Sequence, residues 1–351
     1  MANRSFETKE ITGVKMKKIN ILKRRTFLAV SLSFLIVAAI MSVGFYQSVF
    51  AAEVKQSAQR TFKSPEEATK GLIDALKLND TKELMAIFGP AGKKIIFSGD
   101  EINDKAERER FVNAYEEMNK LEAQTDKKEI LMVGNQEWPF PFPVVKKGET
   151  WIFDTQAGKE ELLNRRIGRN ELNTIETCLA YVDAQREYAI KDRDNDKLLE
   201  YAQKFLSSPG KKDGLYWETN DGDEPSPLGP FAARAVREGY ATKRHGDKPT
   251  PYHGYFYKIL KAQGRNASGG VYNYVIRGRM IGGFALVAYP AEYGTSGIMT
   301  FIVNHEGVVY QKNLGKKTGT IAAAMTKYDP DKTWKKVEER TINDQGAPDK
   351  K

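Results

Sequence analysis

The stretch Pro290–Gly315, PAEYGTSGIMTFIVNHEGVVYQKNLG, decides the fold of the C-terminal half of the chain. Its acidic, tyrosine, serine and histidine side chains could belong to a catalytic loop, but their spacing favours a β-hairpin. Apolar side chains alternate along Ile298–Asn304, and a second β-rich run follows at Val308–Leu314. His305 and Glu306 lie between the two runs, just before a glycine, which is typical of a short turn. We therefore predict that both are turn residues, and a functional pair is the alternative.

Three earlier runs are rich in β-branched and aromatic residues and predict further strands at Gly254–Leu260, Tyr272–Ile276 and Gly283–Pro290. Ser207–Pro251 is rich in Pro and Gly and is expected to form surface loops around one short helix at 231–238.

A long helix is predicted to begin at Lys159 and to extend for about 30 residues, because its apolar positions repeat every three or four residues. They form one stripe of Leu172, Ile175, Leu179 and Val182. The charged residues beside the stripe are expected to form a solvated face: Arg165, Arg166, Arg169, Glu171 and Arg186. Residues 159–330 should thus form a long helix packed on an antiparallel sheet.

A smaller body is predicted at residues 62–155. Ser64 is a helix cap with Pro65 in the first helical position and Glu67 closing a capping box. A second helix should span Thr81–Phe88, and a third should carry aromatic residues between 111 and 118. The period then changes to that of strands at 129–133 and in a hairpin at 143–154 that turns at residues 147–148. Helices followed by a small sheet indicate an α+β body.

Residues 1–51 have the layout of an export signal. Basic residues at 23–25 precede an apolar run at 26–45, and small residues at 49 and 51 indicate cleavage after Ala51. If it is not cleaved, this run is long enough to anchor the chain in a membrane, since about 20 apolar residues can cross a bilayer. The motif RRTFL also leaves the twin-arginine route open beside the general one. We expect the folded part to be exported, either to the periplasm or to the outer side of the inner membrane.

The basic character of the chain comes largely from that leader. Residues 1–51 contain 8 of the 55 Lys and Arg residues but only 2 of the 46 acidic ones, so 47 basic residues face 44 acidic ones in the remainder. This near balance excludes a nucleic-acid-binding protein, which requires clustered positive charge. The single Cys178 cannot form an internal disulfide and is expected to be a small buried hydrophobe. Residues 331–351 are charged and poor in apolar side chains, so the tail is predicted to be disordered.

The sequence resembles an exported bacterial family catalogued as domain of unknown function 2950, through segments such as EWPFPFPVVKKGETWIFDTQAGKEELLNRRIGRNEL and GRMIGGFALVAYPAEYGTSGIMTFIVNHEGVVYQK. This resemblance implies a location in the cell envelope and no established activity. The long helix and the final Tyr-Gly, Gly, Phe-x-Val hairpin also resemble the globular part of type IV pilins and pseudopilins. The order of elements in 62–155 is similar to that of the fold of nuclear transport factor 2.

One aromatic cluster is a candidate pocket for a small apolar ligand. Trp138, Phe140, Phe142 and Trp151 crowd one small sheet, and prolines at 139, 141 and 143 interrupt its strand pairing. Core packing is the alternative. If the protein is an enzyme, Asp154 or Glu137 beside the cluster would be its acid or base.

Two acidic groups are candidate metal ligands. Asp221, Asp223 and Glu224 lie in a flexible loop and could bind a hard cation. Asp192, Asp194 and Asp196 have the spacing of a calcium loop, but the loop lacks its central glycine and final glutamate, which favours a solvated helix end.

Other motifs with catalytic potential are weaker. Ser208-x-x-Lys211 matches part of the signature of a penicillin-recognising enzyme, but Pro and Gly between the two residues favour a turn. The sequence predicts no cofactor. It favours a non-catalytic binding or assembly protein of the envelope with an envelope protein or a small apolar ligand as its partner. A periplasmic enzyme or ligand-binding protein with the aromatic pocket is the alternative.

Overall fold

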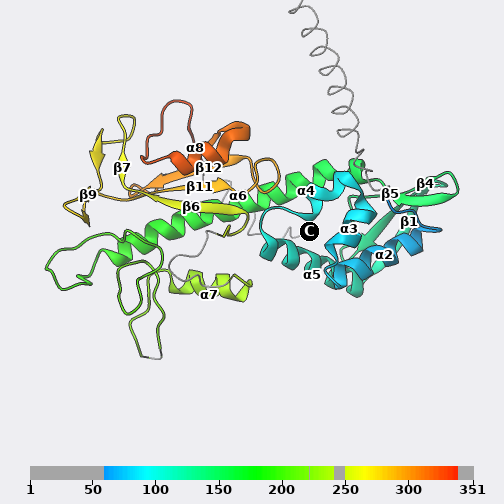
Figure 1. Ribbon diagram of the computed structural model, residues 1–351, viewed down its shortest axis with the longest axis horizontal. Coiled ribbons are helices and arrows are strands. Elements are labelled where there is room, and N and C mark those ends of the chain that lie inside the picture. Colours follow the sequence, from blue (N-terminus) through cyan, green and yellow to red (C-terminus); the bar gives the residue numbers. More distant parts are fainter. Residues whose placement is uncertain (1–58, 221, 241–249, 339–351) are drawn as a thin grey trace, which may run out of the picture. The chain divides into compact units, whose positions relative to one another are not determined.

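A computed structural model describes residues 59–220, 222–240 and 250–338, all within one compact unit, Ser57–Lys351 (Figure 1). The chain is a mixture of helices and antiparallel sheets, which confirms the α+β class. The predicted export segment 1–51 lies outside the described residues, and so does residue 221. Within the described part of the chain, no helix is both long and apolar enough to span a bilayer.

The first two N-terminal helices form where the sequence predicts them. The Glu67 amide donates to Ser64 Oγ at the start of the first helix, and the next helix spans Thr81–Phe88 as expected. A longer helix then begins after Asp100, whose carboxylate caps it. The bounds are α2 Pro65–Lys77, α3 Thr81–Phe88, η1 Pro90–Gly92, α4 Lys93–Ile96 and α5 Glu101–Glu117.

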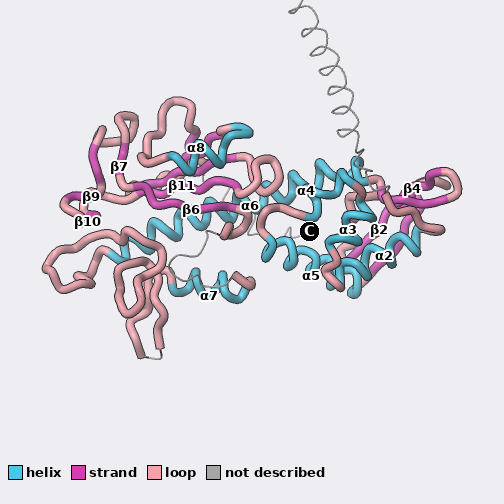
Figure 2. The backbone as a smooth tube through the Cα atoms, in the orientation of Figure 1, coloured by secondary structure: helices cyan, strands magenta, loops and turns pink. Residues whose placement is uncertain are grey.

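A five-stranded antiparallel sheet follows these helices (Figure 2). Its strand order is β1-β2-β4-β5, with β3 paired to β2. Its predicted hairpin forms, because β4 and β5 pair with Lys147 opposite Thr150. No pattern in the sequence predicts β1, which is largely exposed along its length. The bounds are β1 Asn119–Thr125, β2 Lys128–Val133, β3 Trp138–Pro139, β4 Val144–Lys147 and β5 Thr150–Phe153.

The long helix α6 spans Thr155–Tyr188 and begins four residues before its predicted start. The predicted solvated face is wrong for Arg166, which is 7% exposed and donates to the carbonyl oxygens of Lys94 and Ile95 at the end of α4. This contact fixes α6 against the N-terminal helices. The loop with Asp192 is not a helix end, because α6 ends before it.

The C-terminal sheet has the strand order β14-β13-β12-β11-β6, and every pair is antiparallel. The hairpin predicted for Pro290–Gly315 forms between β12 and β13. Thr300, Ile302 and Asn304 are as buried as Phe301 and Val303, so both faces of β12 are covered instead of one. The bounds are β6 Tyr255–Leu260, β11 Ala285–Pro290, β12 Met299–Asn304, β13 Tyr310–Asn313 and β14 Lys335–Lys336.

The pairing of β14 with β13 corrects the predicted disordered tail, which is ordered as far as residue 338, with Val337 buried. Residues 339–351 lie outside the described part. The smaller elements of this half are α7 Gly229–Arg237, β7 Ala262–Gln263, β8 Tyr272–Asn273, β9 Val275–Ile276, β10 Arg279–Met280, η2 Gly315–Lys317 and α8 Thr318–Ala324.

Two hydrophobic clusters fill the described part. One is built from α2, α3 and the first sheet, and the other from α6 and the C-terminal sheet. Cys178 is completely buried in the second cluster and its pKa is raised by burial, so it has the environment of a small hydrophobe.

Candidate functional site

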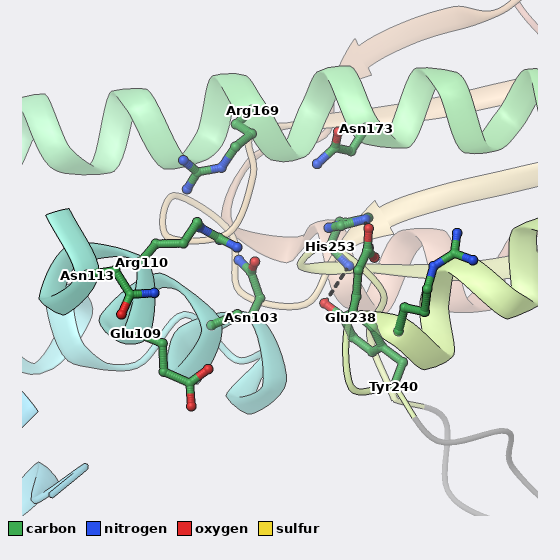
Figure 3. A pocket seen from close by; sticks show the side chains of 11 residues that line it. Asn103, Glu109, Arg110, Asn113, Arg169, Asn173, Glu238, Tyr240 and His253 are labelled. Carbon is green, nitrogen blue, oxygen red and sulfur yellow. Dashed lines mark hydrogen bonds and ion pairs between the residues drawn. The ribbon is translucent and has the colours of Figure 1, made fainter. Parts of the chain in front are cut away.

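A cavity of about 470 Å³ lies where α5, α6, the end of α7 and the segment before β6 meet (Figure 3). Its lining is polar. From α5 come Asn103, Glu109, Arg110 and Asn113 together with an alanine, and from α6 come Arg169 and Asn173. The remaining lining residues are Arg237, Glu238, Tyr240 and His253.

Two arginines from different helices meet at one carboxylate beside this cavity. Arg169 Nη2 lies 2.9 Å from Glu107 Oε1, and Arg110 Nη2 donates to the same oxygen. Both arginines line the cavity, whereas Glu107 does not. A guanidinium has five N–H donors in a planar fork, so each keeps donors for an oxyanion in the cavity.

A second charged group lies at the end of α7. Arg234 Nε is 3.6 Å from Glu238 Oε1, and Arg234 Nη1 is 4.0 Å from Glu176 Oε2 on α6. The other oxygen of Glu238 accepts from the Tyr252 hydroxyl at 3.0 Å and lies 3.2 Å from His253 Nε2. Glu238 therefore belongs to a network of fixed polar groups at the cavity wall.

A buried carboxylate positions this wall. Asp100, 1% exposed, accepts from the Tyr240 hydroxyl at 2.7 Å and from the Gly254 amide at 2.8 Å through Oδ2. Its Oδ1 caps α5 by accepting from the Asn103 amide. Burial and the neighbouring carboxylate raise the pKa of Tyr240, so its hydroxyl stays a donor to Asp100. One side chain thus ties α5 to both Tyr240 and the start of the C-terminal sheet.

The amide of Asn103 is the clearest sign of a ligand. Asn103 is 7% exposed, and its Nδ2 is buried without a hydrogen-bond partner among the described residues. Buried amide donors are rarely left unpaired, because the loss of hydration costs about 1–3 kcal/mol. Figure 3 shows this side chain beside the guanidinium group of Arg110.

His253 has a conformation that L-residues seldom adopt. Its φ is +48°, in the left-handed region. Burial lowers its pKa, with the nearby Glu238 acting in the opposite direction, so the imidazole is mainly neutral near pH 7. Backbone strain of this kind is often found at functional sites.

The predicted aromatic pocket has a different environment. Phe140 and Phe142 are buried among other rings, with centroids 5.2 Å apart, and both belong to the N-terminal hydrophobic cluster. Trp138 and Trp151 are only partly buried at its edge. The cavity described above is lined by other residues, so an apolar ligand at the aromatic cluster stays a prediction.

The two candidate acids beside the aromatic cluster differ in their surroundings. Asp154 caps α6 by accepting from the Ala157 amide at 3.2 Å, which is a structural role. Glu137 is exposed in a turn, with a φ of +50°. Neither lines the cavity.

The two predicted metal ligands that the structure describes, Asp223 and Glu224, already have partners within the protein. Glu224 pairs with Lys191, Arg193 and Lys212, and hydrogen bonds to the two lysines are the main cause that lowers its pKa to about 2. Asp223 accepts from the Asn220 amide. Metal binding at these residues stays a prediction.

The calcium-like loop is similarly neutralised. Oxygen atoms of Asp192, Asp194 and Asp196 lie within 4.8 Å of one another. Arg279 pairs with Asp194 and Asp196, and also with Glu200 at 2.9 Å. The guanidinium group of Arg279 therefore supplies positive charge that balances the carboxylates of this loop.

Ser208 pairs with a different lysine from the one that its motif indicates. Lys204 Nζ donates to Ser208 Oγ at 2.8 Å and to Asp213 at 2.6 Å, while Asp213 also accepts from the Ser208 amide. An ion-paired ammonium cannot take a proton from the hydroxyl, so this group stabilises a turn. His305 and Glu306 lie in the turn after β12, as predicted.

Sequence reasoning missed the residues of the cavity. The charged residues of α6 and the segment PYHGY at the start of β6 can be recognised in the sequence, but no pattern indicates that they lie close to α5. The unusual presence of a histidine just before a glycine and a strand was the only local signal.

The family comparison agrees with the resemblance seen in the sequence. A family model described as Protein of unknown function (DUF2950) matches residues 59–337. No curated protein and no solved structure matches the chain.

Proposed function

Because the chain belongs to the DUF2950 family of proteins of unknown function, we propose its function from the cavity itself. It is a non-catalytic binding protein for a small polar ligand that carries a carboxylate or another oxyanion. The volume of the cavity is within the range of small-molecule sites, about 300–1,000 Å³.

The convergence of Arg110 and Arg169 on Glu107 supports this proposal most directly. Two like charges from separate helices repel each other, and one carboxylate neutralises only one of them. An oxyanion in the cavity would compensate the second charge and accept charge-assisted hydrogen bonds from both guanidinium groups. It would also offer an acceptor to the Asn103 amide, whose Nδ2 has no partner among the residues that the structure describes.

Ligand-observed NMR tests this function. The purified protein is titrated with carboxylates, inorganic phosphate and uncharged sugars, and the double variant Arg110→Gln/Arg169→Gln is compared with Arg165→Gln. Arg165 is a matched control, because it is as exposed as Arg169, is paired with a glutamate on α6 and does not line the cavity. We expect the double variant to bind the oxyanion at least tenfold more weakly and the control to bind it normally. Equal binding by all three proteins would refute the proposal.

An enzyme that uses the same cavity is the second candidate. Glu238 Oε2 lies 3.2 Å from His253 Nε2, the backbone of His253 is strained, and a neutral imidazole can act as a general base. After incubation of the bound ligand with the protein, NMR would show conversion by the wild type and binding without conversion by His253→Gln. An unchanged ligand would favour the binding protein.

The location of the protein is part of the proposal. The sequence of residues 1–51 supports export to the envelope, with either a cleaved signal or a retained anchor, and an envelope protein as a partner. The N-terminal sequence of the mature protein after cell fractionation tests this point. A start at Ala52 in the periplasmic fraction is the expected result, and an intact chain in the cytoplasm would contradict it.

The finer architecture of the two halves is also part of the proposal. A long helix against an antiparallel sheet supports a pilin-like C-terminal part, and helices followed by a small sheet support a fold like that of nuclear transport factor 2 in the N-terminal part. An experimental structure compared with both folds would test these assignments, and unmatched strand connections would reject them.

A further inference from the structure

We propose that the ligand of this cavity is dipolar: a short peptide of about three residues with a free carboxylate at one end and a free ammonium group at the other. This inference rests on the proposed binding function and names its ligand class. It is carried by two charged networks of opposite sign that border the same cavity.

The first network has a net charge of +1 when its members are ionised. It consists of Arg110 and Arg169 with Glu107 between them, and its two arginines line the cavity. This is the place for a carboxylate, which has the planar geometry that a guanidinium fork recognises.

The second network is the inverse of the first. Arg234 lies between Glu176 and Glu238, so two carboxylates share one guanidinium and the net charge is −1. Glu238 lines the cavity, and among the described residues the one charged partner of its Oε1 is Arg234, at the long distance of 3.6 Å. Glu238 is also the C-cap of α7, whose terminal carbonyls add partial negative charge. An ammonium group is the complementary partner here.

The remaining charged residues of the lining do not change this arrangement of one positive and one negative network. Glu109 and Arg237 are both exposed and opposite in sign. The amides of Asn103, Asn113 and Asn173 can each donate and accept, which suits the peptide groups between the two ends of the ligand. A dianion such as phosphate satisfies only the first network and leaves the second without a partner.

The spacing of the two networks sets the length of the ligand. Arg169 and Glu176, the α6 members of the two networks, lie seven residues apart on the same face of the helix, which separates them by about 10 Å along its axis. Glu176 does not itself line the cavity, but Arg234 pairs it with Glu238, which does. Asn173, between Arg169 and Glu176 on the helix, lines the cavity. Because an extended chain advances about 3.3–3.6 Å per residue, three residues span this distance. A single amino acid, with its two charges on one carbon, cannot reach both networks.

Isothermal titration calorimetry with three probes tests the inference on the full protein. The probes are trialanine, N-acetyl-trialanine, which has lost the ammonium charge, and trialanine amide, which has lost the carboxylate. We expect trialanine to bind about tenfold more tightly than either blocked form, since each blocked end loses a charge-assisted contact. Glu238→Gln should bind free and acetylated trialanine equally, whereas Arg169→Gln should bind free trialanine and its amide equally. Arg165→Gln should behave as the wild type.

The possible failures are distinguishable. If the acetylated peptide binds as tightly as trialanine, the dipolar ligand is wrong while the oxyanion function stands. If the amide binds as tightly as trialanine, the Arg110–Arg169 site is not an oxyanion site and the proposed function fails as well. If no probe binds at millimolar concentration while a simple carboxylate does, the peptide class is rejected.

Discussion

Replacing Asp100 by alanine should destabilise the protein far more than replacing a helix cap usually does. The carboxylate has three donors, the Tyr240 hydroxyl and the amides of Gly254 and Asn103. Only the last of these belongs to the capped helix. The other two connect α5 to segments more than a hundred residues further along the chain, so their loss weakens the tertiary structure.

The magnitude follows from these contacts. Loss of the cap costs about 1 kcal/mol. Leaving a buried hydroxyl and a buried amide without an acceptor costs about 1–3 kcal/mol each. Tyr240 borders the cavity, where water can replace part of the lost acceptor, so we expect a total of about 3–5 kcal/mol in the free energy of unfolding.

Asp80→Ala is the matched control. Asp80 caps α3 through the Glu83 amide at 2.9 Å, as Asp100 caps α5, but it is exposed and accepts no long-range bond among the described contacts. Its replacement should cost about 1 kcal/mol. Urea unfolding, followed by tryptophan fluorescence, measures both values from the midpoint and slope.

If Asp100→Ala does not fold, Asp100→Asn provides the comparison, because its remaining oxygen can still cap α5. Its NH₂ group then faces the Gly254 amide, and the loss should be intermediate between those of the two alanine variants. Equal losses for Asp100→Ala and Asp80→Ala would show that the contacts to Tyr240 and Gly254 add nothing, and would refute the reasoning.

Three more predictions concern α6 and the cavity. Gly158→Ala should destabilise the protein, because the new Cβ would lie 2.3 Å from a backbone oxygen. Gly168→Ala, whose new Cβ would have no atom within 4 Å, should stabilise the protein by about 0.5–1 kcal/mol. Thermal or urea unfolding measures both changes. The pKa of His253 is lowered from 6.5 mainly by burial, so the contribution of the neutral imidazole to stability is complete above about pH 6.5 and is lost as the pH falls through the folded-state pKa. The free energy of unfolding of His253→Gln should therefore depend less on pH than that of the wild type. An unchanged pH profile would contradict this. Glu171 accepts from two amides at the start of β12, both at 2.9 Å, so Glu171→Ala should cost about 1–3 kcal/mol, while the exposed Glu160→Ala should have almost no effect.

Elements with local signals were predictable from the sequence. The helix at Thr81–Phe88 lies between an aspartate cap and a Gly-Pro stop, and both signals act within a few residues. The hairpin of β12 and β13 was predictable for the same reason. In contrast, β1 and β14 are short or polar strands whose identity depends on a partner strand. Their own residues carry neither a period nor a strong propensity.

The cavity was not predictable, because its residues come from segments that no local pattern connects. Asn103 and Arg110 lie on α5, Arg169 on α6, and His253 just before β6. The sequence also drew attention to the wrong residues. Aromatic side chains at 138–153 are conspicuous, but the most buried of them fill a core, and acidic runs near 194 are neutralised by Arg279.

The polar residues that seemed least informative in the sequence are the ones that build the site. A charged helix face predicts solvent exposure, yet Arg166 reaches into the end of α4, and Asn170 donates to the Ser296 carbonyl at 2.9 Å. Together with Asp100, these contacts fix α4, α5 and the start of the C-terminal sheet around α6. Since each depends on a single buried group, they hold the cavity walls with directional bonds instead of apolar packing. Such bonds have one satisfied geometry, so they hold α5 and the segment before β6 in fixed positions beside α6, which is what the proposed selection of a ligand by length and by charge requires.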